Sequence, residues 1–319
     1  RLAAAGLSTD DRQAEADRLY EHLHAKGEAA EPARIGAAYK LASIGDTALA
    51  VRLLGKALYT DRESVRRAAT YGLIAVGPEA TSSFLEATTS PIKWVRKAGV
   101  YGLGDASPLN EGVLQAVATL LKKDPSVYIR SVAAGTLGCL GRRAVATGVG
   151  KELVPACLDA LVQSLGCEEN RLAMDRAQGR SIKFVRPTDE CDVCEGGGVD
   201  FGLERFAPVR SAVRENALWS VVILCSHGAA VIGDALEPTV AALQKVIHTD
   251  ENAICVGFAM DALSRLVHLR PQDEEVTPLI CDLQANLVSI LGASPMQCWE
   301  ALVRGGLSAN AISEFDQPA

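Results

Sequence analysis

The cysteine pair Cys191 and Cys194, spaced as Cys-x-x-Cys, is the arrangement in this sequence that comes nearest to metal chemistry. A structural zinc site needs four ligands, normally two such pairs. Cys167 is the nearest further cysteine in sequence, and no histidine lies between positions 25 and 226. We therefore expect no metal site and inert thiols; zinc binding by Cys191 and Cys194, a redox pair and a local disulfide are the alternatives.

Catalytic spacing is not evident elsewhere in the sequence. His22 and His24 would point about 200° apart on a helix, so they cannot chelate one ion together. The glycines 196–198 lack the spacing and the following Lys-Ser/Thr of a phosphate-binding loop. No Ser/His/Asp or Cys/His arrangement is supported by spacing. We expect no catalytic residue and no cofactor, and a protein that is not an enzyme.

Three similar stretches organise the chain: 63–77, 94–104 and 128–141. Aligned on an apolar-Arg pair, the steps are about 30 residues from Val65 to Val95 and about 34 from Val95 to Ile129. Fainter copies begin near Ala33, Val213 and Cys255. A fixed period of this size indicates a solenoid, in which stacked repeats bury a core that one repeat cannot bury alone.

Each repeat is expected to hold two helices, an A helix and then a B helix. Within 62–76, the residues Val65, Ala68, Ala69, Gly72 and Leu73 fall on one helical face, and their small side chains permit close approach of a neighbour. Arg67 points away from this face. The pattern predicts A helices at about 47–58, 79–89 and 110–122, and B helices at about 62–76, 92–104 and 126–140. Helices are also expected at 10–26, 32–44, 151–165, 235–248, 252–268, 274–291 and 295–304.

Composition limits the functional class. A formal charge of −7 and a pI near 5.4 argue against a nucleic-acid binder, which needs a basic field. No apolar run reaches the roughly 18 residues that span a bilayer. Nine cysteines without any Asn-x-Ser/Thr acceptor favour a reducing, intracellular compartment. We expect a soluble or peripheral protein of the cytoplasm or an organelle; because the sequence begins at Arg1, a preceding targeting peptide and a plastid location stay open.

The stretches around Val65-Arg66, Val95-Arg96 and Ile129-Arg130 resemble HEAT repeats, and the short period with its Gly-Leu-Gly ending resembles most the phycobilisome-lyase type. The resemblance covers residues 30–142 and, loosely, 205–268. It implies an all-α, right-handed α-solenoid of about six to seven HEAT-like helix pairs. In HEAT families an Asp ahead of the B helix and an Arg early in it form a ladder between repeats. Asp61/Arg66 and Asp124/Arg130 match this pattern, whereas Arg96 and Arg214 lack an Asp at that spacing.

Two columns of equivalent positions are candidate functional residues. The first is a ladder of arginines that either fixes the geometry between repeats or forms a basic stripe for an acidic partner or pigment: Arg34, Arg66, Arg96, Arg130 and Arg214. The second is aromatic and either lines one edge of the concave surface as interface anchors or fills gaps between helices: Tyr39, Tyr71, Tyr101 and Trp219. We add Arg67 to the partner-binding candidates.

A long insertion at 167–207 is expected to separate two halves of the solenoid, 1–166 and 208–319. Its first part is basic, with Arg176, Arg180 and Arg186, and its second part, 189–204, carries six acidic residues and no base. Loops of this length are usually functional or disordered. We expect a docking arm that becomes ordered on a partner.

These features favour a non-catalytic scaffold or adaptor that belongs to, or assembles, a multi-subunit complex. The resemblance also implies an alternative, a bilin lyase-like subunit or photosynthetic-complex factor that acts with a partner chain and handles a tetrapyrrole. A nuclear-transport or phosphatase adaptor is disfavoured because the repeats are shorter than those families use. Protein partners are expected, with no nucleic acid and no transmembrane segment.

Overall fold

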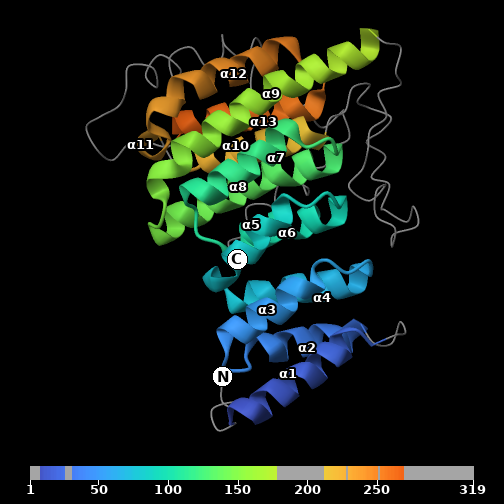
Figure 1. The fold of residues 1–319 in the computed structure, drawn as a ribbon. Helices are drawn as coiled ribbons and strands as arrows, with labels where there is room; N and C mark the ends of the chain where they lie inside the picture. The colour runs from blue at the N-terminus through green and yellow to red at the C-terminus, as the bar shows by residue number, and fades with distance from the viewer. Residues whose placement is uncertain (1–7, 26–30, 178–211, 228, 251, 269–319) are drawn as a thin grey trace. The chain divides into compact units, whose positions relative to one another are not determined.

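The computed structural model describes residues 8–25, 31–177, 212–227, 229–250 and 252–268 (Figure 1). The described residues are helical, joined by turns. The chain divides after Gly150 into two compact units, called here the N-terminal unit (1–150) and the C-terminal unit (151–319). No helix in the described ranges combines the length and apolarity needed to cross a membrane.

The N-terminal unit is built from helices that alternate between two layers. One layer holds the A helices α1 (Thr9–Leu23), α3 (Thr47–Ala57), α5 (Thr81–Thr88) and α7 (Glu111–Lys123). The other holds the B helices α2 (Glu31–Ala42), α4 (Glu63–Val76), α6 (Lys93–Ala106) and α8 (Val127–Thr147). A 3₁₀ turn, η2 (Pro78–Ala80), leads into α5.

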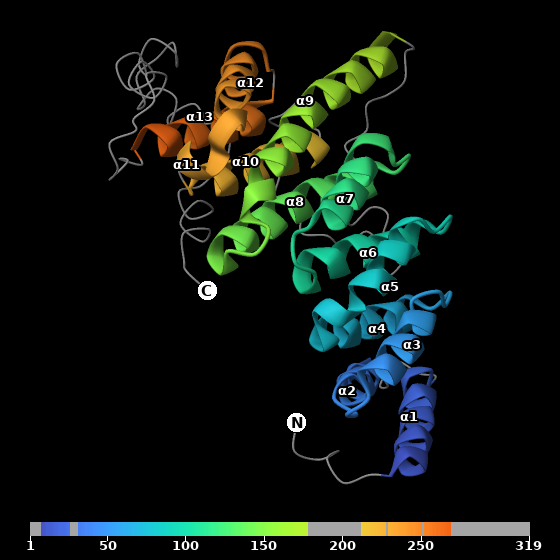
Figure 2. The ribbon, with the colours of Figure 1, turned by 60° about the vertical axis from the view of Figure 1, so that its left-hand side comes forward.

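Packing follows the repeat. Each A helix packs against the B helix that follows it, and consecutive B helices pack side by side in the order α2, α4, α6, α8 (Figure 2). The described residues thus form a helical repeat protein. The expected α-solenoid is confirmed at this level, while its right-handedness and its total of six to seven pairs stay predictions.

Helix starts are set by the turn residues. Asp46, Asn110 and Ser126 are N-caps whose side-chain oxygens accept a hydrogen bond from the backbone N–H three residues on, at 2.9, 3.0 and 3.4 Å. Such caps satisfy one of the four backbone donors that a helix start leaves open. The predicted helices in this unit agree with the observed bounds to within a few residues, except that α8 continues to Thr147.

A glycine allows close contact between α5 and α6 in the N-terminal unit. The fully buried ring of Phe84 on α5 lies over Gly102 of α6, where an added Cβ would come within 2.0 Å of the ring. A Cβ on Gly99 would meet the Phe84 carbonyl oxygen at 2.8 Å. The expected close approach at small residues is therefore observed, and it joins the two helices of one repeat.

The C-terminal unit begins with the short 3₁₀ helix η3 (Lys151–Leu153) and α9 (Val154–Ala177). It continues with α10 (Ala212–Cys225), α11 (Ala229–Ile232), η5 (Gly233–Ala235), α12 (Leu236–Thr249) and α13 (Ala253–His268). Here α9 packs on α10, α12 on α13, and α10 on α13.

Helix α9 is longer than the predicted 151–165 and runs through the start of the expected insertion. After Gly166 the sequence Cys-Glu-Glu-Asn-Arg-Leu-Ala-Met contains no glycine or proline to stop the helix. Glu168, which is buried, is bonded by Arg171 one turn on. Residues 178–207 of the insertion and the helices predicted at 274–291 and 295–304 lie outside the described residues.

Candidate functional site

The ladder arginines of the N-terminal unit bind the turn before their own helix. Each Nη1 donates to the carbonyl oxygens six and five residues earlier: Arg66 to Thr60 and Asp61, Arg96 to Ser90 and Pro91, and Arg130 to Asp124 and Pro125. These distances lie between 2.7 and 3.2 Å. Arg34, in the first repeat, donates instead to the Ala25 carbonyl beyond the end of α1. Each of these arginines therefore holds backbone groups in place.

One rung crosses between repeats. Arg96 Nε and Nη2 donate to the two carboxylate oxygens of Asp124 at 2.6 and 3.0 Å, and both side chains are shielded, 12% and 2% exposed. Arg96 has no Asp at the spacing of the family's ladder, and that spacing pairs Asp124 with Arg130. Instead the Asp124 carboxylate binds Arg96, the arginine of the preceding repeat. Arg130 donates to the backbone oxygen of Asp124. The carboxylate also accepts the Ser126 N–H at 2.9 Å, which fixes its direction.

The same rung occurs in the C-terminal unit. Arg214 of α10 pairs with the carboxylate of Asp250, which lies in the turn before α13, and both are buried. Next to this pair Glu215, also buried, accepts a 2.9 Å hydrogen bond from the side-chain amide of Asn252. Arg214 likewise has no Asp at the ladder spacing, and its partner again comes from the following repeat.

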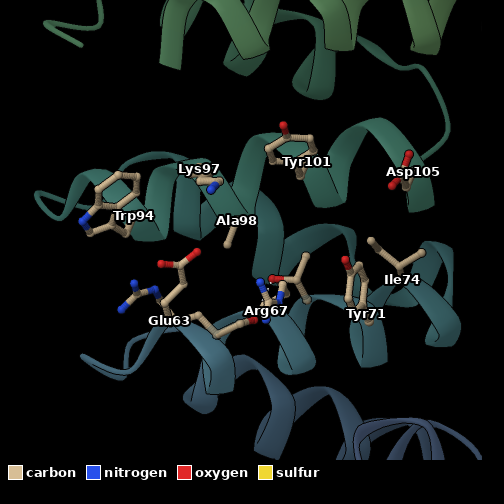
Figure 3. Close-up of a pocket in the computed structure, with 11 residues that line it drawn as sticks. Glu63, Arg67, Tyr71, Ile74, Trp94, Lys97, Ala98, Tyr101 and Asp105 are labelled. Carbon is tan, nitrogen blue, oxygen red and sulfur yellow. Dashed lines mark hydrogen bonds between the residues drawn. The ribbon is translucent and has the colours of Figure 1, made fainter. Parts of the chain in front are cut away.

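A groove of about 300 Å³ lies between α4 and α6 on the B-helix side of the N-terminal unit (Figure 3). Tyr71 and Ile74 of α4 and Tyr101 of α6 face it, with Trp94 at one end and Asp105 at the other (Figure 3). Its remaining lining residues are Glu63, Arg66, Arg67, Thr70, Lys97 and Ala98. Three predicted partner-binding residues, Arg67, Tyr71 and Tyr101, thus meet at one site.

The tyrosines of this column are open to solvent. Tyr39, Tyr71 and Tyr101 are 48%, 40% and 44% exposed. This holds although α4 and α6 each pack between two other B helices, and α2 packs on α4. The equivalent position on α8 is Gly135, where an added Cβ would meet nothing within 4 Å. Trp219, the fourth member, is half-buried in the C-terminal unit. The exposed part of the column therefore spans α2, α4 and α6.

Cations flank the groove on its α6 side. The Lys97 ammonium lies 5.5 Å from the Trp94 ring centre and 5.2 Å from that of Tyr128, and the Lys93 ammonium lies 4.2 Å from Trp94. The rings of Trp94 and Tyr128 meet edge-on at 6.4 Å. Cation–π contacts of this kind fix a lysine in place without neutralising it, so the groove keeps a positioned positive charge.

Trp94, Lys97 and Asp105 were not among the predicted site residues. A signal for Lys97 was present in the repeat alignment, because Lys97 follows Arg96 as Arg67 follows Arg66. The predicted Arg180, Arg186, Cys191 and Cys194 lie outside the described residues, as does the side chain of Arg176.

Thiol groups and potential metal-binding side chains are present in the described parts of the chain. No group of three or more His, Cys, Asp or Glu side chains is arranged there to hold a metal ion. Burial raises the pKa of the Cys157 and Cys225 thiols to about 12, so both stay protonated at neutral pH. The groove itself offers aromatic surface, a few charges and hydroxyl groups, which suit binding.

Comparisons with solved structures include matches to engineered proteins. No family model matches the sequence, and a search of curated proteins gave no match. Among solved structures, one crystal structure of an engineered protein is 16% identical over 79% of this chain and 96% of its own, with a TM-score of 0.38. A second engineered protein is 16% identical over 78% of this chain and 97% of its own, with a TM-score of 0.39.

Proposed function

We propose that this chain is a non-catalytic scaffold or adaptor of the HEAT-like, right-handed solenoid type, and that the groove between α4 and α6 receives a protein partner. The observation that carries the proposal is the exposure of Tyr39, Tyr71 and Tyr101 at one equivalent position on three consecutive B helices. Tyrosine supplies a large, rigid contact surface with a polar tip, and it is enriched among residues that dominate binding energy.

The rest of the groove supports the same function. Interfaces combine an apolar centre with charged groups at the rim that set orientation. Here Tyr71, Ile74 and Tyr101 form the centre, and Glu63 and Asp105 stand toward its ends (Figure 3). The ladder arginines hold the turns and the spacing of the helices that present these side chains, which makes the surface preorganised.

If the groove is the docking surface, replacing its exposed tyrosines should abolish binding of the protein partner. The test is affinity isolation of the tagged protein from its source, comparing the wild type with the double variant Tyr71→Ala/Tyr101→Ala. Tyr59→Ala is the matched control, because Tyr59 is as exposed as Tyr71, at 40%, and does not line the groove. Circular dichroism confirms that all three proteins are folded.

We expect one set of stoichiometric partners with the wild type and with Tyr59→Ala, and its loss from the double variant. Retention by the double variant would reject the groove as the docking surface. An absorption spectrum of the eluate checks the alternative function: a visible tetrapyrrole band would favour a bilin lyase-like subunit over a scaffold.

A further inference from the structure

Two parallel rows of side chains cross the B-helix layer of the N-terminal unit. The tyrosine row (Tyr39, Tyr71, Tyr101) stands five residues after the ladder arginine of each helix. The cation row (Arg67 on α4 and Lys97 on α6) stands one residue after it. On α2 the position equivalent to Arg67 and Lys97 is Ile35. Four residues separate the rows on each helix, about one turn or roughly 6 Å.

The rows have a fixed spacing from helix to helix. Because α2 packs on α4 and α4 on α6, neighbouring axes lie about 8–10 Å apart. A ligand that crosses the layer therefore meets a tyrosine every 8–10 Å or so, with a second row beside it at the same repeat. Both rows end at α8, where Ser131, which is buried, and Gly135 take the two positions.

A polyproline II helix has the matching period. It has three residues per turn and a rise of about 3.1 Å, so each of its faces repeats every ~9 Å. It has no internal hydrogen bonds and is already formed in the free peptide, so it loses little conformational entropy on binding. Proline rings also pack well in grooves lined by aromatic side chains. An α-helix or a β-strand laid across the same layer would present its faces at about 5.4 Å or 6.8 Å and fall out of step.

The charges of the cation row indicate which residues the peptide should carry on the face beside the one that contacts the tyrosines. Arg67 and Lys97 line the groove next to Tyr71 and Tyr101, and both stand on the same side of the tyrosine row. A carboxylate on the peptide would meet this row, while Glu63 and Asp105 disfavour acidic groups at the groove ends and so restrict the alignment. Ile35 on α2 offers no charge at that step, so two of three carboxylates in a repeating peptide would meet a cation.

We propose that the tyrosine and cation rows bind a proline-rich peptide segment in the polyproline II conformation, with apolar residues toward the tyrosines and an acidic residue at every third position toward Arg67 and Lys97. This inference rests on the proposed scaffold function and names the chemistry of its partner. The footprint covers α2, α4 and α6, which corresponds to about nine residues of peptide at ~3.1 Å each.

The test uses three fluorescein-labelled nonapeptides and fluorescence anisotropy on the full chain. The first repeats Pro-Pro-Glu, the second repeats Pro-Pro-Lys and the third repeats Gly-Gly-Glu, which keeps the charge and removes the preformed helix. We expect the first to bind at least about tenfold more tightly than either of the others, and its affinity to fall as NaCl is raised. Equal binding of the first and third peptides, or of the first and second, would overturn the proposal.

Variants locate the site. Tyr101→Ala is expected to weaken the Pro-Pro-Glu peptide about tenfold, and Lys97→Glu is expected to invert the preference between the Glu and Lys peptides. Tyr59→Ala should bind as the wild type does. If Tyr101→Ala proves unfolded by circular dichroism, the charge inversion at Lys97 still decides, because an unchanged preference in that variant contradicts the assignment.

The outcome separates the two proposals. If no peptide binds but the Tyr71→Ala/Tyr101→Ala variant still loses its cellular partner, the scaffold function stands and the polyproline assignment fails. If that variant keeps its partner and no peptide binds, both fail.

Discussion

The N-terminal and C-terminal units use the same ion pair and surround it differently. In both, a ladder arginine near the start of a B helix, Arg96 or Arg214, pairs with an aspartate in the turn before the next B helix, Asp124 or Asp250. The residue that directly follows the ladder arginine differs between the two units in charge and in exposure. In the N-terminal unit it is Arg67 or Lys97, which line a groove, whereas in the C-terminal unit it is Glu215, which is buried against Asn252.

Four residues further on, the contrast repeats. Tyr71 and Tyr101 are exposed, while Trp219 is half-buried. The arginine position therefore serves architecture in both units, and the neighbouring positions decide whether a unit presents a surface or encloses a polar network. A residue's repeat position alone does not reveal its role; its neighbours in the adjacent repeat do.

Loss of the arginine–aspartate pair should lower the free energy of unfolding by a similar amount in both units, and this is the largest of the expected effects. Arg96→Ala and Arg214→Ala each leave a buried aspartate without its arginine, so each should lower the free energy of unfolding by about 3–5 kcal/mol. Urea unfolding combined with peptide-level hydrogen exchange assigns the loss to one unit or the other. A large loss for one variant and none for the other would show that the ladder is not shared architecture.

Replacing a helical glycine by alanine should change stability in opposite directions in the two units, which is the second-largest expected effect. Gly102→Ala places a methyl group against Phe84 and should cost about 2–3 kcal/mol by overpacking. Gly166→Ala, on α9 of the C-terminal unit, meets nothing within 4 Å and should stabilise by about 0.5–1 kcal/mol through helix propensity. Thermal unfolding of the two variants measures both signs, and a shift in the same direction for both contradicts the difference.

The residue after the arginine gives a third contrast. Glu215→Ala removes the acceptor of the Asn252 amide and should lower stability by about 2 kcal/mol, whereas Glu215→Gln keeps an acceptor and should lower it less. Arg67→Ala should change stability by no more than about 0.5 kcal/mol, as surface substitutions usually do, and should weaken partner binding instead. Urea midpoints and binding curves together test this division, which fails if Arg67→Ala unfolds the N-terminal unit.

A pH effect, the smallest, is expected in the N-terminal unit. Partial burial, with the positive charges of Arg62 and Lys56 nearby, lowers the pKa of His24 below its usual 6.5. The unfolded chain therefore takes up the proton first, and stability should fall as the pH drops below about 6.5, by less than about 1 kcal/mol because solvent screens the site. His24→Gln should flatten the stability profile between pH 7 and 5; an unaltered slope would assign the effect to other groups.

Much of the N-terminal unit follows from its sequence. The helical period placed α3, α4, α6 and α7 within a few residues, and alignment of the repeats brought Tyr71, Tyr101 and Arg67 to one groove. These predictions hold because they depend on local periodicity and on equivalence between repeats.

Other features depend on how neighbouring repeats stack. The partner of Arg96 lies 28 residues ahead, in a turn whose carboxylate is aimed by the Ser126 N–H, and no spacing within one repeat reveals it. The fit of Phe84 over Gly102 depends on the separation of two helices. The prediction of 151–165 falls short of α9, which runs to Ala177 because no glycine or proline after Gly166 stops it.

The contact of Phe84 with Gly102 lies inside one helical hairpin, since α5 and α6 belong to the same repeat, whereas the Arg96–Asp124 pair joins that hairpin to the next. The Phe84 contact is thus internal to one repeat, whereas the Arg96–Asp124 ion pair links two consecutive repeats, whose B helices also pack directly on each other. A repeat added to or removed from the array would therefore leave the Phe84–Gly102 contact intact, but the new boundary would have to rebuild both the ion pair and the packing of the B helices.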